Sequence, residues 1–137
     1  MRIERDLAGH AADGIPAAIR AGGLIFVDAC EGGSGQTGVQ CDTAYRALAD
    51  RLQLCGSSAK NVVRLDHFTE SQGWLSERQK VRARYFGRPA PLASTGVAVR
   101  HCLPNRLSVA GIAVDESRKK SVRIEGGTFG MPAIATA

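Results

Sequence analysis

Side chains that can transfer protons are grouped at two places in the sequence. Asp28, Cys30 and Glu31 end one apolar run, and His101 and Cys102 follow a later one. Neighbouring carboxylates can separate their pKa values and act as acid and base, and histidine transfers protons near neutral pH. The sequence therefore predicts four catalytic candidates: Asp28, His101, Cys30 and Glu31. Cys30 or Cys102 beside His101 could instead form a nucleophile–base pair, and a third interpretation is that His101 and Cys102 only end a loop.

The cysteines do not form a metal-binding pattern. The chain has Cys30, Cys41, Cys55 and Cys102, and none of them belongs to a CxxC pair, so we predict no zinc site and no other cofactor. The first ten residues, MRIERDLAGH, lack the apolar region of a secretory signal. We therefore expect a cytoplasmic protein with reduced thiols. No apolar run reaches the roughly 18 residues that would span a membrane.

A glycine-rich segment allows two interpretations. Residues 33–38, GSGQTG, match the G-x-G-x-x-G pattern and precede a predicted helix, as in dinucleotide-binding loops. The first of these glycines, however, comes well after the apolar run. Asp66 also lies farther along the chain than the roughly 20 residues expected for the acidic partner. The favoured interpretation is a connection in which glycine permits turns.

The net charge of the chain indicates which kinds of partner it could bind. Among 137 residues, 18 Lys and Arg face 13 Asp and Glu, for a net charge of +5. Two clusters hold much of the positive charge, at Arg78, Lys80, Arg82, Arg84 and Arg88, and then at Arg118, Lys119, Lys120 and Arg123. Such clusters could attract an anionic partner. Aromatic residues make up only 5% of the chain, which leaves little for base stacking, so nucleic-acid binding is not the preferred interpretation.

The hydrophobic pattern predicts one α+β domain. Strands are expected at 2–6, 17–20, 24–29, 61–68, 94–99 and 107–114, with a possible edge strand at 117–125. Helices are expected at 39–55, where apolar residues recur every three or four positions, and at 75–86, which Gly87 and Pro89 end. Two helices on one face of a mixed sheet fit this order. We assign residues 1–125 to the domain and 126–137 to a C-terminal tail.

Several segments together resemble the RidA/YjgF (reactive intermediate deaminase) family. Residues 19–27, IRAGGLIFV, resemble its "AGGLVFVSGQ" segment, and residues 44–58 resemble its "QALENLKAVLEAAGSS" helix. Residues 61–65, NVVRL, are similar to its "DVVKV" strand, and 81–91 to its "YAEYFGEPPPA" segment. Residues 94–97 and 111–114 fit its last two strands. The resemblance covers about residues 14–115.

This resemblance implies a fold, an assembly and a chemistry. The family has a chorismate-mutase-like fold and forms homotrimers with clefts between subunits. Its well-studied members hydrolyse imines and enamines, and an arginine, a tyrosine, an asparagine and a glutamate line their clefts. This chain departs from the family at those positions: the arginine becomes Ala93 or Thr95, the tyrosine Ile15, the asparagine Gln79 and the glutamate Ala110. We place these five residues and Cys102 in the substrate-binding set.

Three functional hypotheses follow. The preferred one is a RidA-like enzyme with an altered site, which hydrolyses, deaminates or tautomerises a small imine, enamine or enol. The second is a non-catalytic trimer that binds a metabolite or a protein, because a neutral side chain cannot replace the charged fork of an arginine. The third is an RNA-associated protein, given the basic second helix.

Overall fold

The computed structural model describes residues 3–5, 18–70, 75–87, 92–100 and 106–116. Their elements are β1 (Ile3–Arg5), β2 (Ala18–Ala21), β3 (Leu24–Glu31), α1 (Thr37–Leu54), a 3-10 turn (Ala59–Asn61), β4 (Val62–Thr69), α2 (Leu75–Phe86), β5 (Ala93–Ala98) and β6 (Leu107–Val114). The predicted element order is confirmed within these ranges. The possible strand at 117–125 and the tail at 126–137 lie outside the described residues.

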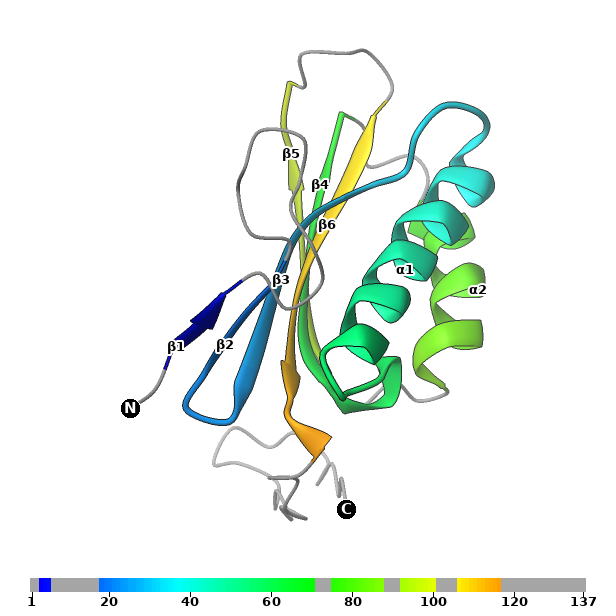
Figure 1. Ribbon diagram of the computed structural model, residues 1–137. Coiled ribbons are helices and arrows are strands. Elements are labelled where there is room, and N and C mark those ends of the chain that lie inside the picture. Colours follow the sequence, from blue (N-terminus) through cyan, green and yellow to red (C-terminus); the bar gives the residue numbers. More distant parts are fainter. Residues whose placement is uncertain (1–2, 6–17, 71–74, 88–91, 101–105, 117–137) are drawn as a thin grey trace, which may run out of the picture.

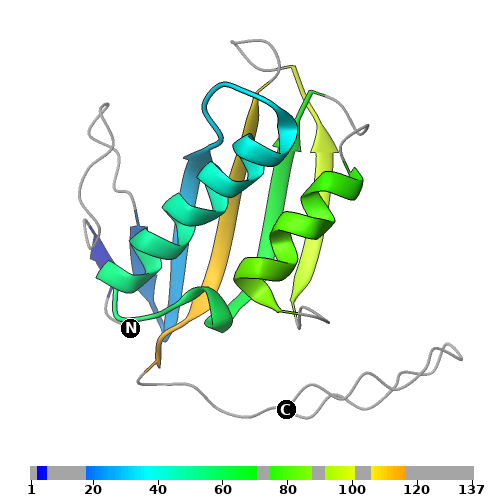
Figure 2. The same cartoon turned by 90° about the vertical axis from the view of Figure 1, so that its right-hand side faces the viewer.

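The strands form one mixed sheet in the order β1-β2-β3-β6-β4-β5. Strand β6 lies between β3 and β4 and is antiparallel to both, whereas β4 and β5 are parallel. Both helices pack on the same side of this sheet, as Figure 1 shows, and the view in Figure 2 looks onto the helices with the sheet behind them. This confirms the predicted α+β class with two helices on one face.

The core fills the space between the helices and the sheet. Helix α1 contributes Cys41, Ala44, Tyr45, Leu48 and Leu52, all with 1% exposure or less. These residues follow the three- and four-residue spacing of one helix face, which explains why the segment folds as a helix against a sheet. Strand β6 alternates buried and half-buried positions along its length, so every second side chain points at the helices.

The loop after β3 passes very close to α1. A Cβ built on Gly32 would lie 2.7 Å from the backbone oxygen of Gln40, so only glycine fits there without movement. The Gln40 side-chain amide donates a hydrogen bond to the Gly35 carbonyl at 2.9 Å, and Gly33 and Gly35 have φ angles of 71° and 114°. The glycines of this loop therefore permit a tight connection that α1 itself stabilises.

One arginine links four parts of the chain, and we call this arrangement the Arg20 bridge. The Arg20 guanidinium pairs with Glu4 at 3.0 Å and with Asp115 at 3.1 Å. It also donates a hydrogen bond to the Cys55 carbonyl at the end of α1. A cation at a helix C-terminus satisfies carbonyls that have no partner within the helix. The bridge thus joins β1, β2, the end of α1 and the segment after β6.

No helix among the described residues is both long and apolar enough to cross a membrane.

Candidate active site on the open face of the sheet

We call the face of the sheet opposite α1 and α2 the open face, because no described element covers it (Figure 1). Its side chains are identified by alternation with the buried ones. In β4, Leu65, His67 and Thr69 are buried, so Arg64, Asp66 and Phe68 point to the open face. The strand pairings then arrange the open-face residues in rows that run across β3, β6, β4 and β5.

The central row is the most polar. Asp66 on β4 pairs with Ala110 on β6 and with Thr95 on β5. On β3 the register shifts between Val27 and Cys30, where Val27 pairs with Gly111 and Cys30 with Val109. Asp28 therefore lies in a β-bulge opposite Ala110, and its side chain is exposed. Bulges often occur beside active sites, where they redirect a side chain.

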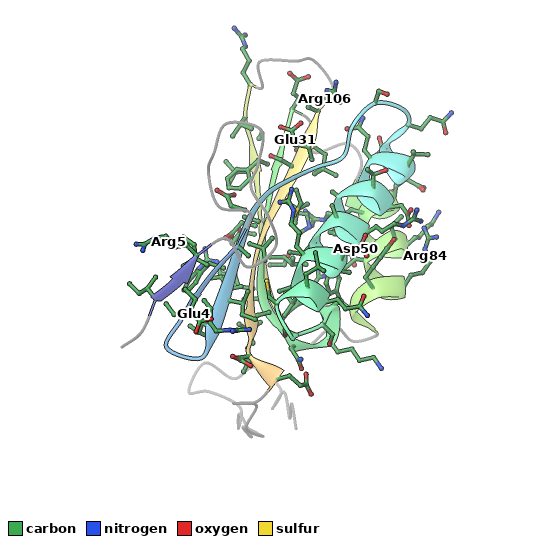
Figure 3. All side chains as sticks on the ribbon, in the orientation of Figure 1. Glu4, Arg5, Glu31, Asp50, Arg84 and Arg106 are labelled. Carbon is green, nitrogen blue, oxygen red and sulfur yellow. The ribbon has the colours of Figure 1, made fainter. Side chains whose placement is uncertain are left out.

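The rows on either side are more apolar. One contains Phe26, Ile112, Arg64 and Ala93, and the other contains Glu31, Ser108, Phe68 and Val97. Glu31 and Arg106 lie at the end of the sheet away from Glu4 of β1 (Figure 3). The central row is thus a band of polar groups between larger side chains.

Asp66 is held by two neighbours. The Arg64 Nε donates to both carboxylate oxygens at 3.1 Å, and the Thr95 hydroxyl donates to Oδ1. These hydrogen bonds, with that of Arg64 the largest cause, lower the pKa of Asp66. Asp66 is therefore ionised near neutral pH and keeps a fixed orientation. From the sequence, Asp66 was considered only as the acidic partner of a dinucleotide site. Arg64, Asp66 and Phe68 alternate along the predicted strand with Leu65 and His67, and this spacing could have indicated that the three share one face of the sheet.

Cys30 lies on the other side of the sheet from Asp28. It is fully buried in the core, where desolvation by burial raises the pKa of its thiol to about 11. Arg51 of α1 donates to the Asp28 carbonyl at 2.7 Å and to the Cys30 sulfur at 3.4 Å. The bulge is the reason for this separation, because in a regular strand residues 28 and 30 would share one face. The structure therefore does not bring Asp28 and the Cys30 thiol together.

The other predicted site residues divide between described and undescribed positions. Glu31, Ala93, Thr95 and Ala110 all lie on the open face with Asp28. Gln79 is an exposed residue of α2, in the helix layer. The predictions for Ile15, His101 and Cys102 fall outside the described residues. Among the described residues no group of three or more His, Cys, Asp or Glu side chains could hold a metal ion.

A buried histidine lies behind the central row, on the helix side. His67 Nδ1 is 3.0 Å from the Thr95 carbonyl oxygen, and its Nε2 is 2.7 Å from the Tyr45 hydroxyl. Because a carbonyl can only accept, Nδ1 carries the proton and Nε2 accepts from Tyr45. Desolvation lowers the pKa of His67 to about 4. His67 is therefore neutral at physiological pH and positions the backbone of Thr95.

Comparisons with solved structures identify proteins that share this architecture. A YjgF-family protein from Neisseria meningitidis has a TM-score of 0.74 and 23% identity, over 85% of this chain and 97% of the other. Rv2704 of Mycobacterium tuberculosis, from the YjgF/YER057c/UK114 family, has a TM-score of 0.70 and 22% identity, over 82% and 99%. RidA from an Antarctic Psychrobacter has a TM-score of 0.69 and 16% identity, over 83% and 98%.

Other comparisons set the limits of this likeness. No protein-family model and no curated protein sequence matches the chain. Eight of the matching structures share between 15% and 26% identity with it. The resemblance noted in the sequence is nevertheless confirmed in three dimensions, because this chain has the fold of the YjgF/YER057c/UK114 (RidA) family over 85% of its length.

Proposed function

We propose that this protein is an enzyme that acts on a small reactive metabolite at the open face of the sheet. The reaction class is hydrolysis, deamination or tautomerisation of an imine, enamine or enol. One observation carries the proposal: Asp28, Ala110, Asp66 and Thr95 form a polar row across four strands, between rows that contain Phe26, Ile112 and Phe68. A small polar compound fits such a surface, where charged groups fix its orientation and apolar groups exclude water.

The residues of the row have different roles in this proposal. Asp66 is the fixed group, because Arg64 and Thr95 orient its carboxylate toward a substrate N–H or O–H. Ala110 presents only a methyl group between Asp28 and Asp66, which leaves space for the reacting atoms. Neighbouring strands lie about 4.8 Å apart, so the two aspartates are about 10 Å apart at their backbones and can contact one small molecule from both sides.

Asp28 is the proposed proton carrier. In imine hydrolysis, water adds to the carbon of the C=N bond and the nitrogen leaves as an amine. A carboxylate that takes a proton from the attacking water and returns it to the departing nitrogen serves both steps. Tautomerisation needs the same transfer between carbon and nitrogen or oxygen. Asp28 suits this role because its side chain is exposed at the bulge, beside the methyl group of Ala110.

The open face also supports the proposed homotrimer. Phe26 is 40% exposed, Val97 47% and Leu24 36%, and Phe26 and Val97 flank the central row. Exposed apolar side chains on a sheet face favour contact with another chain. We propose that further copies cover this face and turn it into clefts between subunits. Light scattering should give a mass of three chains of 14.5 kDa, and a monomer would contradict the cleft.

The alternative is a non-catalytic binder of a metabolite. The low pKa of Asp66 favours it, because a carboxylate stabilised in its ionised form is a good hydrogen-bond acceptor and a poor base. In this case Asp66 and Arg64 hold the ligand and no proton moves. A third role, in binding RNA, has no support on the open face, where Asp28, Asp66 and Glu31 would repel phosphates.

The decisive experiment is a turnover survey with imines, enamines and enols, using wild type and two variants. Asp28→Asn should reduce any activity found by about a hundredfold or more. Asp50→Asn is the matched control, because Asp50 is exposed on α1 in the helix layer (Figure 3). Equal activity in wild type and Asp28→Asn would refute the proton carrier. Ligand binding without turnover, lost in Asp66→Asn, would establish the binder instead.

A further inference from the structure

Arg51 of α1 contacts strand β3 at the place where the strand bulges. Its Nη1 atom donates one hydrogen bond to the Asp28 carbonyl at 2.7 Å and another to the Cys30 sulfur at 3.4 Å. Arg51 lies in the last turn of the helix and is half-buried. A single nitrogen atom of the helix layer therefore contacts the residues on both sides of Ala29.

The bulge decides which side chains of β3 reach the open face. Two residues of β3, Asp28 and Ala29, are opposite Ala110 alone on β6, which is the arrangement of a β-bulge. Asp28 is exposed, and beyond the bulge Cys30 is buried and Glu31 is exposed. In a regular strand, residues 28 and 31 would lie on opposite faces. The bulge is therefore the reason that both carboxylates point to the open face.

The bulge also brings these two carboxylates closer along the sheet. Asp28 is opposite Ala110, and Glu31 is opposite Ser108. Ala110 and Ser108 are two residues apart on β6, which corresponds to about 7 Å along a strand. Asp28 and Glu31 are thus neighbours on the open face, although they are three positions apart in the sequence.

The contacts of Arg51 favour this bulged register over a regular one. Without the bulge, the residues after Asp28 would shift by one position, so that Cys30 would turn to the open face and Glu31 to the helices. The Cys30 sulfur would then leave Arg51. A contact that exists in only one of two arrangements shifts the equilibrium toward that arrangement. The bond to the Asp28 carbonyl acts in the same direction, because a bulge disrupts the ladder and a charged donor binds a backbone carbonyl strongly.

We propose that Arg51 is a positioning residue of the open face, because it holds the bulge of β3 from the helix side and so keeps Asp28 and Glu31 together on one face. Arg51 itself does not touch a substrate on the open face, since the sheet lies between them. Its effect on catalysis rests on the proposed function, whereas its effect on the bulge does not. The two effects are therefore tested by separate measurements.

The first measurement is the rate at which iodoacetamide labels Cys30 in the native protein, followed by mass spectrometry. Arg51→Met keeps an unbranched side chain without a donor and should raise this rate about tenfold or more, because the thiol turns outward when the bulge is lost. Cys41 is the internal reference, since it is equally buried and global unfolding would expose both thiols. Burial raises the pKa of the Cys30 thiol and Arg51 partly offsets this, so a thiol that stayed in place would react more slowly without Arg51.

Two substitutions in α1 accompany this variant. Arg46→Met is the matched control, because Arg46 is on the same helix but exposed, 2.7 Å from Asp42, and it should leave the labelling of Cys30 unchanged. Arg51→Lys should restore most of the protection. Both contacts of Arg51 come from one nitrogen atom, and a lysine ammonium also presents its donors on one nitrogen.

Deletion of Ala29 tests the same contact from the strand. Without this residue, Asp28 and the two residues after it would be opposite residues 108–110 of β6 one by one, and regular alternation would then keep Cys30 buried. In this background Arg51→Met should not change the labelling of Cys30. If Arg51→Met does not fold in the full chain, it should fold in this background, and failure to fold in both would overturn the proposal.

The second measurement is the kinetics of any turnover found with imines, enamines or enols. Arg51→Met should lower kcat about tenfold with little change in KM, and Arg51→Lys should recover much of the loss. An inactive wild type would refute the proposed function and leave the labelling experiment to decide the role of Arg51. That role is wrong if Cys30 is labelled at the wild-type rate in Arg51→Met, or if an active enzyme keeps its kcat in this variant.

Discussion

Acidification should destabilise this protein through one buried side chain, His67. An unfolded histidine has a pKa near 6.5, whereas burial lowers the pKa of His67 to about 4 in the folded chain. Between these values the unfolded state binds a proton that the folded state does not. The contribution of His67 to the free energy of unfolding is therefore complete above pH 6.5, and it is lost as the pH drops toward 4. At about 1.4 kcal/mol per pH unit, the loss over this window approaches 3 kcal/mol.

Urea unfolding followed by circular dichroism at pH 4.0 to 7.5 measures this loss, at one fixed protein concentration because oligomers unfold in a concentration-dependent way. His67→Gln is the informative variant, since glutamine can donate to the Thr95 carbonyl and accept from Tyr45 without titrating. It should be less stable than wild type at pH 7.5, yet lose less stability on acidification. If both proteins show the same pH slope between 6.5 and 4, the assignment of His67 as the titrating group is wrong.

Three further predictions concern other parts of the fold. Arg20→Ala removes the Arg20 bridge and should cost about 1–3 kcal/mol in urea unfolding, whereas Arg46→Ala, which breaks an exposed helix pair, should have a much smaller effect because solvent screens that pair; equal effects would contradict the bridge. Gly32→Ala should cost about 1–3 kcal/mol because its Cβ collides with α1. Gly38→Ala has open space to 3.8 Å and should be neutral or stabilising by up to about 1 kcal/mol. Cys30, with a thiol pKa of about 11, should resist iodoacetamide at pH 7.5 until urea is added, and mass spectrometry that found rapid labelling would refute its burial.

The element boundaries were largely predictable because they depend on local signals. The helix at Leu75–Phe86 and the strand at Leu107–Val114 agree with the prediction, since Gly87 ends the helix and a nearly continuous apolar run marks the strand. The first helix begins at Thr37, two residues before the predicted start. Gly38 has a low helix propensity, so the pattern became clear only from Val39.

The face on which each candidate lies was not predictable from the pattern alone. Asp28 and Cys30 are two residues apart, and a regular strand would present both on one side. The bulge opposite Ala110 reverses this and buries Cys30. Its position depends on the pairing of β3 with β6, about 80 residues later in the chain. Local spacing carries no information on such a distant register.

The two faces of the sheet are connected through Thr95. Its carbonyl accepts a hydrogen bond from His67 on the helix side, and its hydroxyl donates to Asp66 on the open face. Thr95 lies on the edge strand β5, which has β4 as its neighbour in the sheet, so this bond from His67 restrains a strand that would otherwise move more easily. The orientation of Asp66 therefore depends on packing in the helix layer. A variant that displaces Tyr45 or His67 should change the orientation of Asp66 although no residue of the open face is substituted. The pKa of Asp66 should then rise as the Thr95 hydrogen bond weakens.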